Sequence, residues 1–193
     1  MPSCSRLFWS IIICSVIAGC DSRPQFRSTD ISGAPYGHAL ALTDHTGKPR
    51  RLEDFRGKAV VLFFGFTHCP DVCPTTLAEI ALAMKQLGAD AERVQVLMVS
   101  VDPERDTPES LGKYVTAFDP RFLALRGDLA ATKKVADEFK IYFEKAKSGE
   151  SYTVNHSVQS YVIDPQGRLR LLVRHDRIGQ DLAEDLRAIL KGA

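Results

Sequence analysis

The sequence has little net charge and no long hydrophobic run. Its 193 residues include 25 Lys and Arg against 24 Asp and Glu, a formal net charge of +1 at pH 7. Because positive and negative charges are so nearly equal, the protein has no net electrostatic attraction to nucleic acid or to an anionic surface. Internal repeats and low-complexity blocks are also absent. The chain therefore fits one globular domain with a sizeable core rather than a nucleic-acid-binding or repeat protein.

The apolar stretch at residues 7–16 follows Arg6 and is too short to cross a membrane as a mature helix. This pattern predicts an export signal over residues 1–19. The tripeptide Ile-Ala-Gly before Cys20 resembles a bacterial lipobox, which implies cleavage before Cys20 and lipidation of Cys20. An uncleaved signal anchor is the alternative. Asp21 resembles an inner-membrane retention signal, so we expect a lipid-anchored protein on the periplasmic side of the inner membrane, in the bacterial cell envelope.

Cysteine is scarce once the predicted signal is set aside. Of five cysteines, Cys4 and Cys14 would leave with the signal and Cys20 would carry lipid. Cys69 and Cys73 then remain as the possible thiols of the folded domain. In an oxidising compartment two nearby thiols form a disulfide unless something keeps them reduced. The redox state of this pair is therefore predicted to be part of the function.

The two cysteines directly follow a short apolar run at residues 59–66, which is typical of a buried central strand. Pro74 suits the first turn of a helix, predicted over residues 74–87. At the N-terminal edge of a helix, free N–H groups and the helix dipole favour a thiolate and lower the thiol pKa below about 8.5. A thiolate is a metal ligand or a nucleophile, and both uses remain open.

The rest of the chain predicts an α/β fold with a mixed sheet flanked by helices. We expect a flexible tether over residues 20–35, followed by a single domain over residues 36–193. The domain would begin with a hairpin at residues 38–52. Further strands are predicted at residues 94–101, 122–125, 158–163 and 169–173, helices at 107–118, 128–139 and 180–190, and a polar hairpin loop at 145–151.

Three segments resemble the hallmark segments of the Sco/SenC family: THCPDVCP at residues 67–74, SVDPERDTP at 100–108 and YTVNHS at 152–157. The resemblance extends from about Pro35 through nearly the whole domain. It implies a thioredoxin-like fold with an added N-terminal hairpin, and a copper site formed by Cys69, Cys73 and His156. It also implies a role in assembling the Cu(A) centre of cytochrome c oxidase. Expected partners are the oxidase subunit that carries Cu(A), a copper donor and a thiol reductant.

Two thiolates and one imidazole form a soft ligand set that suits Cu(I) and can hold Cu(II), whereas zinc prefers a fourth ligand in a closed structural site. His68 is the competing histidine, and we interpret it as a residue that tunes the thiolate pKa. Asp71 either orients the cysteine loop or is solvated. The acidic cluster at residues 102–106 is interpreted as fixing its loop and capping a helix, with partner recognition as the alternative. The remaining histidines are interpreted as non-ligands: His38, His45 and His175.

Other functions remain open at this point. A thiol:disulfide oxidoreductase would use Cys69 as the attacking thiolate and Cys73 as the resolving thiol. Such enzymes typically have two residues between the cysteines and a cis-proline beside them, but this chain has three, and no proline occurs between Pro120 and Pro165. The peroxiredoxin pattern is absent, and a membrane-bound copper or redox sensor is a further alternative. We predict a metallochaperone that uses dithiol chemistry during transfer. The polar loop at residues 145–151 is interpreted as a mobile hairpin tip, and its opening on metal transfer is the alternative, because it lies close to His156 in the sequence.

Overall fold

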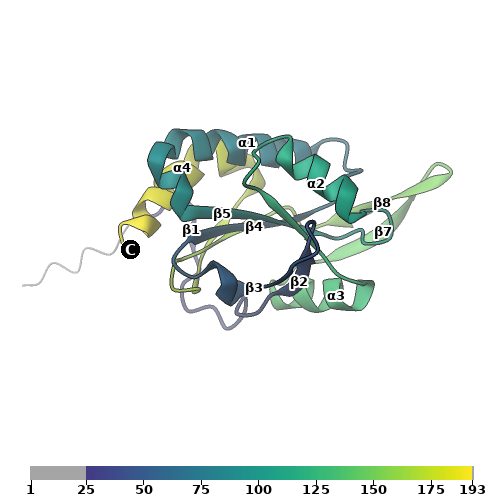
Figure 1. Ribbon diagram of the computed structural model, residues 1–193, viewed down its shortest axis with the longest axis horizontal. Helices are drawn as coiled ribbons and strands as arrows, with labels where there is room; N and C mark the ends of the chain where they lie inside the picture. The colour runs from purple at the N-terminus through teal and green to yellow at the C-terminus, as the bar shows by residue number, and fades with distance from the viewer. Residues whose placement is uncertain (1–24, 193) are drawn as a thin grey trace, which may run out of the picture.

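The computed structural model describes residues 25–192 (Figure 1). The predicted signal, the cleavage site and Cys20 lie outside the described residues. Within them, eight strands form one mixed sheet in the order β1-β10-β9-β4-β5-β6-β2-β3. The central strands β4, β5 and β6 are parallel, and every other pairing is antiparallel. The strands span Thr29–Asp30 (β1), Ala41–Asp44 (β2), Pro49–Arg51 (β3), Ala59–Gly65 (β4), Val94–Ser100 (β5), Leu123–Arg126 (β6), Ser160–Ile163 (β9) and Leu169–Val173 (β10).

Helices cover both faces of the sheet. Helices α1 (Val72–Leu87), α2 (Pro108–Thr116) and α4 (Ile178–Leu190) lie above the sheet in Figure 1, and α3 (Leu129–Glu138) lies below it. Short 3-10 helices span Leu52–Phe55, Gly88–Arg93 and His175–Arg177. All seven residues of β4 are buried, and residues 59–64 alternate between the two hydrophobic cores. Burial on both faces explains why this strand is a continuous apolar run. Among the described residues, no helix is long and apolar enough to span a membrane.

The predicted N-terminal hairpin is confirmed, and side chains cap the helices that begin at Pro108 and Leu129. The hydroxyl of Thr107 accepts a hydrogen bond from the Ser110 N–H at the start of α2, and the carboxylate of Asp128 accepts one from the Ala131 N–H at the start of α3. Strands β2 and β3 form the expected hairpin, and β2 also pairs with β6. The hairpin therefore extends the sheet beyond β6.

The predicted tether extends too far toward the domain. Residues 29–30 form strand β1, which pairs with β10, and the backbone N–H groups of Arg27 and Ser28 donate to the carboxylate of Asp185 on α4. The ordered fold thus begins before residue 36. The polar composition of this segment concealed the strand because a two-residue edge strand needs backbone pairing and no apolar side chains.

A second, two-stranded sheet is formed by β7 (Phe143–Ser148) and β8 (Ser151–His156), and this hairpin projects from the body at the right of Figure 1. The predicted loop at 145–151 was therefore too wide, because residues 145–148 belong to β7 and only Gly149 and Glu150 lie between the strands. His156 is the last residue of β8 rather than part of a loop. Strand β7 is mostly exposed and Val154 is the one buried residue of β8, so apolar side chains mark the ends of these strands only weakly.

Candidate metal centre

The two thiols occupy different environments at the carboxyl end of β4. Cys69 lies half-buried in the loop before α1, whereas Cys73 lies in the first turn of α1 with 1% of its surface exposed. Helix α1 begins at Val72, two residues earlier than predicted, so Pro74 is its third residue. Its missing N–H causes no loss there because the first four helical N–H groups have no partner within the helix. Both cysteines are free thiols.

Gly65, at the end of β4, makes room for the Cys73 thiol. A Cβ atom at this position would lie 2.9 Å from the Sγ of Cys73 and 3.2 Å from the Phe63 ring. Sequence reasoning missed this residue. A glycine inside a strand, directly before a functional loop, is the signal that could have identified it.

The thiols differ in acidity. Cys69 Sγ accepts hydrogen bonds from the Cys73 thiol and from backbone N–H groups at Asp71 and Cys73, and these bonds lower the pKa of Cys69 to about 5. The same thiol–thiol bond, together with burial, raises the pKa of Cys73 well above its ordinary value. Cys69 therefore carries the negative charge and Cys73 keeps its proton. The predicted lowering of pKa holds for Cys69 and is wrong for Cys73, because Cys73 is buried and donates to its neighbour.

His156 faces the cysteine pair from strand β8. Its Nε2 atom lies 3.7 Å from the Sγ of Cys73, and its Nδ1 atom lies 2.8 Å from the carbonyl oxygen of Ser157. A carbonyl oxygen only accepts, so Nδ1 carries a proton, and in the neutral ring the lone pair of Nε2 points toward the thiols. The ring also packs edge-on against Phe66, with 5.9 Å between the ring centroids.

The structure thus connects Cys69 to Cys73 and Cys73 to His156, three residues that lie up to 87 positions apart in the chain. Within residues 25–192, no three His, Cys, Asp or Glu side chains are gathered closely enough to hold one metal ion together. Cys73 contacts both of the other residues. Their donor atoms, two sulfurs and one imidazole nitrogen, fit a soft ion such as Cu(I).

A buried carboxylate fixes the loop that carries Cys69. Asp106 is fully buried and accepts hydrogen bonds from the hydroxyls of Thr67 and Ser100, each at 2.6 Å, and from the backbone N–H of Thr67. Asp102 is also buried, and its carboxylate accepts hydrogen bonds from Arg105 and from the Tyr152 hydroxyl. The loop-fixing interpretation of residues 102–106 agrees with these bonds, whereas Asp102 and Asp106 are too buried to form a recognition surface.

The other candidate residues lie around or away from the thiols. His68 is exposed, and its Nδ1 lies 3.1 Å from the Thr67 hydroxyl and 3.9 Å from the Asp106 carboxylate. Asp71 is exposed, and its side chain makes no capping hydrogen bond at the start of α1. The remaining histidines have other surroundings: His38 is exposed, His45 accepts from the Ala124 N–H, and His175 bonds to Thr76.

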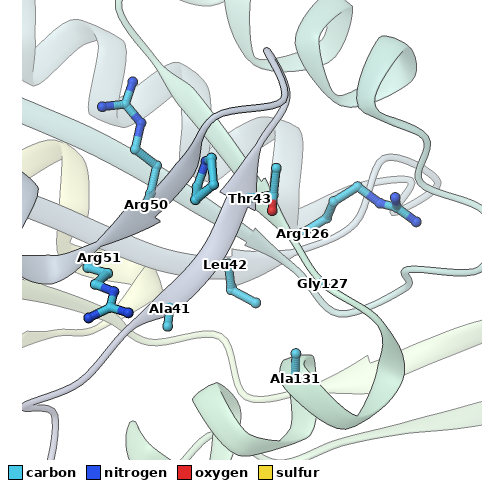
Figure 2. A pocket seen from close by; sticks show the side chains of 9 residues that line it. Ala41, Leu42, Thr43, Arg50, Arg51, Arg126, Gly127 and Ala131 are labelled. Atoms are coloured by element: carbon cyan, nitrogen blue, oxygen red, sulfur yellow. The ribbon is translucent and has the colours of Figure 1, made fainter.

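A pocket between the N-terminal hairpin and α3 lies apart from the thiols. Figure 2 shows that the side chains of Arg50, Arg51 and Arg126, which line it, point in different directions. Arg50 is also paired with Asp44 at 2.7 Å. These arginines therefore do not converge on one anion.

The fold and the site together define a thioredoxin-like domain in which a dithiol at a helix start faces an imidazole. The chain belongs to the SCO1/SenC family, whose model matches residues 28–191. The predicted family and the predicted thioredoxin-like mixed fold are confirmed.

Similar proteins come from mitochondria and bacteria. The bovine mitochondrial protein SCO2 homolog is 35% identical over 170 residues, which cover 86% of this chain and 64% of that protein. For yeast mitochondrial SCO2 the identity is 39%, covering 68% of this chain and 45% of that protein. The chain therefore spans about two thirds or less of these curated relatives.

Solved structures match over nearly their whole length. Bradyrhizobium japonicum ScoI with copper bound is 38% identical, covers 80% of this chain and 99% of its own, and has a TM-score of 0.74. Apo Sco1 from Thermus thermophilus is 41% identical, covers 86% of this chain and 98% of its own, and has a TM-score of 0.77.

Proposed function

We propose that the protein is a copper metallochaperone that binds its cargo through Cys69, Cys73 and His156 and assists assembly of the Cu(A) site of cytochrome c oxidase. The observation that supports this proposal is that Cys73 contacts both Cys69 and Nε2 of His156. Family membership and the copper-bound state of the B. japonicum relative support copper as the cargo. A more distant neighbour, BsSco, is described as a member of the Sco family of cytochrome c oxidase assembly proteins.

Each of the three residues has a distinct task in this proposal. The Cys69 thiolate is half-exposed and already charged, so it makes the first contact with incoming copper and the last with departing copper. Cys73 must release its proton to become a ligand, which couples copper loading to proton release. His156 supplies a nitrogen lone pair without losing a proton, because its Nδ1–H is already held by the Ser157 carbonyl.

The binding test titrates the purified, reduced protein with Cu(I) in competition with a chelator of known affinity. We expect one copper per chain, loss of tight binding in Cys69→Ser and Cys73→Ser, and weaker binding in His156→Ala. The matched control is His38→Ala, an exposed histidine interpreted as a non-ligand, which should bind as the wild type does. Undiminished one-to-one binding in all three site variants would overturn the ligand assignment.

The pathway test deletes the gene and measures cytochrome c oxidase activity with and without added copper. A chaperone for Cu(A) predicts low oxidase activity that is restored by the wild-type gene and by excess copper. It also predicts no restoration by the Cys69→Ser gene without added copper. Normal oxidase activity in the deletion strain would reject the oxidase as the recipient.

Thiol reduction is the second candidate function, favoured by the difference in acidity between the thiols. The Cys69 thiolate would attack a target disulfide and form a mixed disulfide, releasing one target thiolate. Cys73, after losing its proton, would displace the second target thiolate and form a Cys69–Cys73 disulfide. The target gains two electrons, and a separate thiol reductant must then reduce the chaperone. Purified protein that reduces a model disulfide peptide no faster than Cys73→Ser would exclude this activity.

The location is proposed as the periplasmic side of the inner membrane, with Cys20 lipidated. Bacterial relatives support an envelope protein: a Rickettsia prowazekii SCO2-like protein is 36% identical, and a Bacillus anthracis structure is described as a SCO1/SenC family lipoprotein. Incorporation of labelled palmitate into the wild type but not into Cys20→Ala, together with membrane fractionation, tests the anchor. A wild-type chain that takes up no label would reject it.

A further inference from the structure

Hairpin β7–β8, which carries His156, is joined to the loop at residues 101–106 by a cluster of three side chains. The Arg105 guanidinium lies 3.8 Å from the centroid of the Tyr152 ring on β8. It also lies 5.9 Å from the centroid of Phe66, whose ring packs against His156. Arg105 therefore contacts both the hairpin and the wall of the thiol site.

Hydrogen bonds also join the residues of this cluster. The Tyr152 hydroxyl donates to Oδ1 of Asp102 at 2.8 Å, and Arg105 Nε donates to Oδ2 of the same carboxylate at 2.5 Å. Arg105 Nη1 also donates to the backbone carbonyl of Tyr152 at 2.9 Å. Each of the three residues contacts the other two, and we call Asp102, Arg105 and Tyr152 the clasp.

Apart from the packing of Phe143 and Val154 on the hydrophobic core, the hairpin has few other attachments to the body. Strands β7 and β8 pair only with each other among the strands of the described chain, and of their residues Val154 alone is buried. The ion pair between Lys145 and Glu104 joins two exposed side chains, and such pairs contribute little. The clasp is therefore the main polar connection between the hairpin and the domain.

We propose that the clasp is a positioning device that seats His156 against Cys73 and thereby favours retention of Cu(II) over Cu(I). Tyr152 and His156 lie on one strand, four residues and about 13 Å apart, so fixing one end of β8 restrains the other. Two thiolates satisfy Cu(I), whereas Cu(II) gains more from a nitrogen donor. Loosening the clasp withdraws the imidazole and leaves the dithiol, which deepens the proposed copper function and rests on it.

The test compares Tyr152→Leu, Tyr152→Phe and the wild type. Tyr152→Phe keeps the ring on Arg105 and loses only the hydroxyl bond to Asp102. Tyr142→Leu is the matched control, since Tyr142 is an exposed tyrosine just before β7. In the reduced, copper-free protein, NMR measures cross-peaks between the His156 and Phe66 rings and amide exchange in β7 and β8. Chelator competition then gives the Cu(II) and Cu(I) affinities.

We expect Tyr152→Leu to lose the ring cross-peaks and to exchange the β7–β8 amides at least about tenfold faster. Its Cu(II) affinity should fall by about 10- to 100-fold, the range typical of residues that orient metal ligands, while Cu(I) affinity should change far less. In amide exchange and Cu(II) affinity, Tyr152→Phe should lie between Tyr152→Leu and the wild type. Tyr142→Leu should match the wild type in both.

Retained cross-peaks and unchanged exchange in Tyr152→Leu would overturn the positioning role. Equal losses of Cu(II) and Cu(I) affinity would overturn the selective role. If the wild type bound no copper, the proposed function would fail, while the copper-free NMR measurements would still decide whether the clasp seats His156.

Discussion

The Nε2 atom of His156 lies 3.7 Å from the Sγ of Cys73, although 83 residues separate them in the chain. This contact gives the buried thiol a second polar neighbour besides Cys69. The two thiols therefore have different surroundings. Cys69 is half-exposed and charged, whereas Cys73 is enclosed between Gly65, Cys69 and His156.

The first prediction concerns alkylation of the two thiols. Because the pKa of Cys69 is lowered to about 5, its reaction with iodoacetamide should rise with pH around pH 5 and be nearly level from pH 6.5 to 8. Cys73 should stay unmodified over this range, since its pKa is raised and its thiol is buried. Mass spectrometry of the reduced protein, with unfolded protein as control, checks both sites. Faster labelling of Cys73 than of Cys69 would contradict the difference in acidity.

The lowered pKa of Cys69 also predicts a pH dependence of stability. A thiol whose pKa falls on folding stabilises the folded state fully above its unfolded pKa of about 8.5. That contribution declines as pH falls through the interval down to about 5, the pKa of folded Cys69. The difference in free energy of unfolding between the wild type and Cys69→Ser should therefore shrink from pH 9 to pH 5. Urea denaturation of the reduced proteins measures it, and a constant difference would disagree.

Gly65→Ala should disturb the packing around the Cys73 thiol. The new Cβ would lie 2.9 Å from Cys73 Sγ, and overpacking of this kind costs about 1–3 kcal/mol. We expect a lower Tm and weaker Cu(I) binding. Gly179→Ala is the control because its Cβ would make an ordinary contact, at 3.4 Å, with Glu79. A Gly65→Ala protein with wild-type Tm and copper affinity would show that Cys73 does not need this space.

Asp106→Asn should loosen the loop that carries Cys69. The substitution removes a buried charge that accepts from Thr67 and Ser100, and losing one such charge-assisted bond costs about 1–3 kcal/mol. It should also lower the pKa of Cys73, since the Asp106 charge contributes to raising it. Asp176→Asn, at an exposed ion pair, is the control for thermal unfolding and for pH-dependent alkylation of Cys73. Identical behaviour of the two variants would refute this role.

Asp185→Ala should free the N-terminal segment from α4. The buried carboxylate holds the N–H groups of Arg27 and Ser28, and their loss should cost about 1–3 kcal/mol. Limited proteolysis should then cleave near residues 27–31 faster than in the wild type, while Glu184→Ala, an exposed neighbour, should not change the rate. Unaltered cleavage would mean that pairing of β1 with β10 is sufficient to hold the segment.

Much of the fold could be predicted because short sequence patterns determine many of its strands, helix ends and turns. The apolar run of β4, the cap residues Thr107 and Asp128 and the hairpin turns all encode structure over a few residues. Strand β1 and the full extent of the β7–β8 hairpin could not be found this way. Strand β1 has two residues and β7 is mostly exposed, so backbone pairing with other segments decides where these strands begin and end.

The sequence by itself determined the chemistry that is available: two thiols after a buried strand, and a histidine in a segment resembling one family. Only the tertiary structure decided how these groups differ. The bond from Cys73 to Cys69, the space left by Gly65 and the approach of His156 all depend on packing between distant segments. A pKa follows burial and neighbours in space, so the charge on Cys69 and the proton on Cys73 emerge only when the chain has folded.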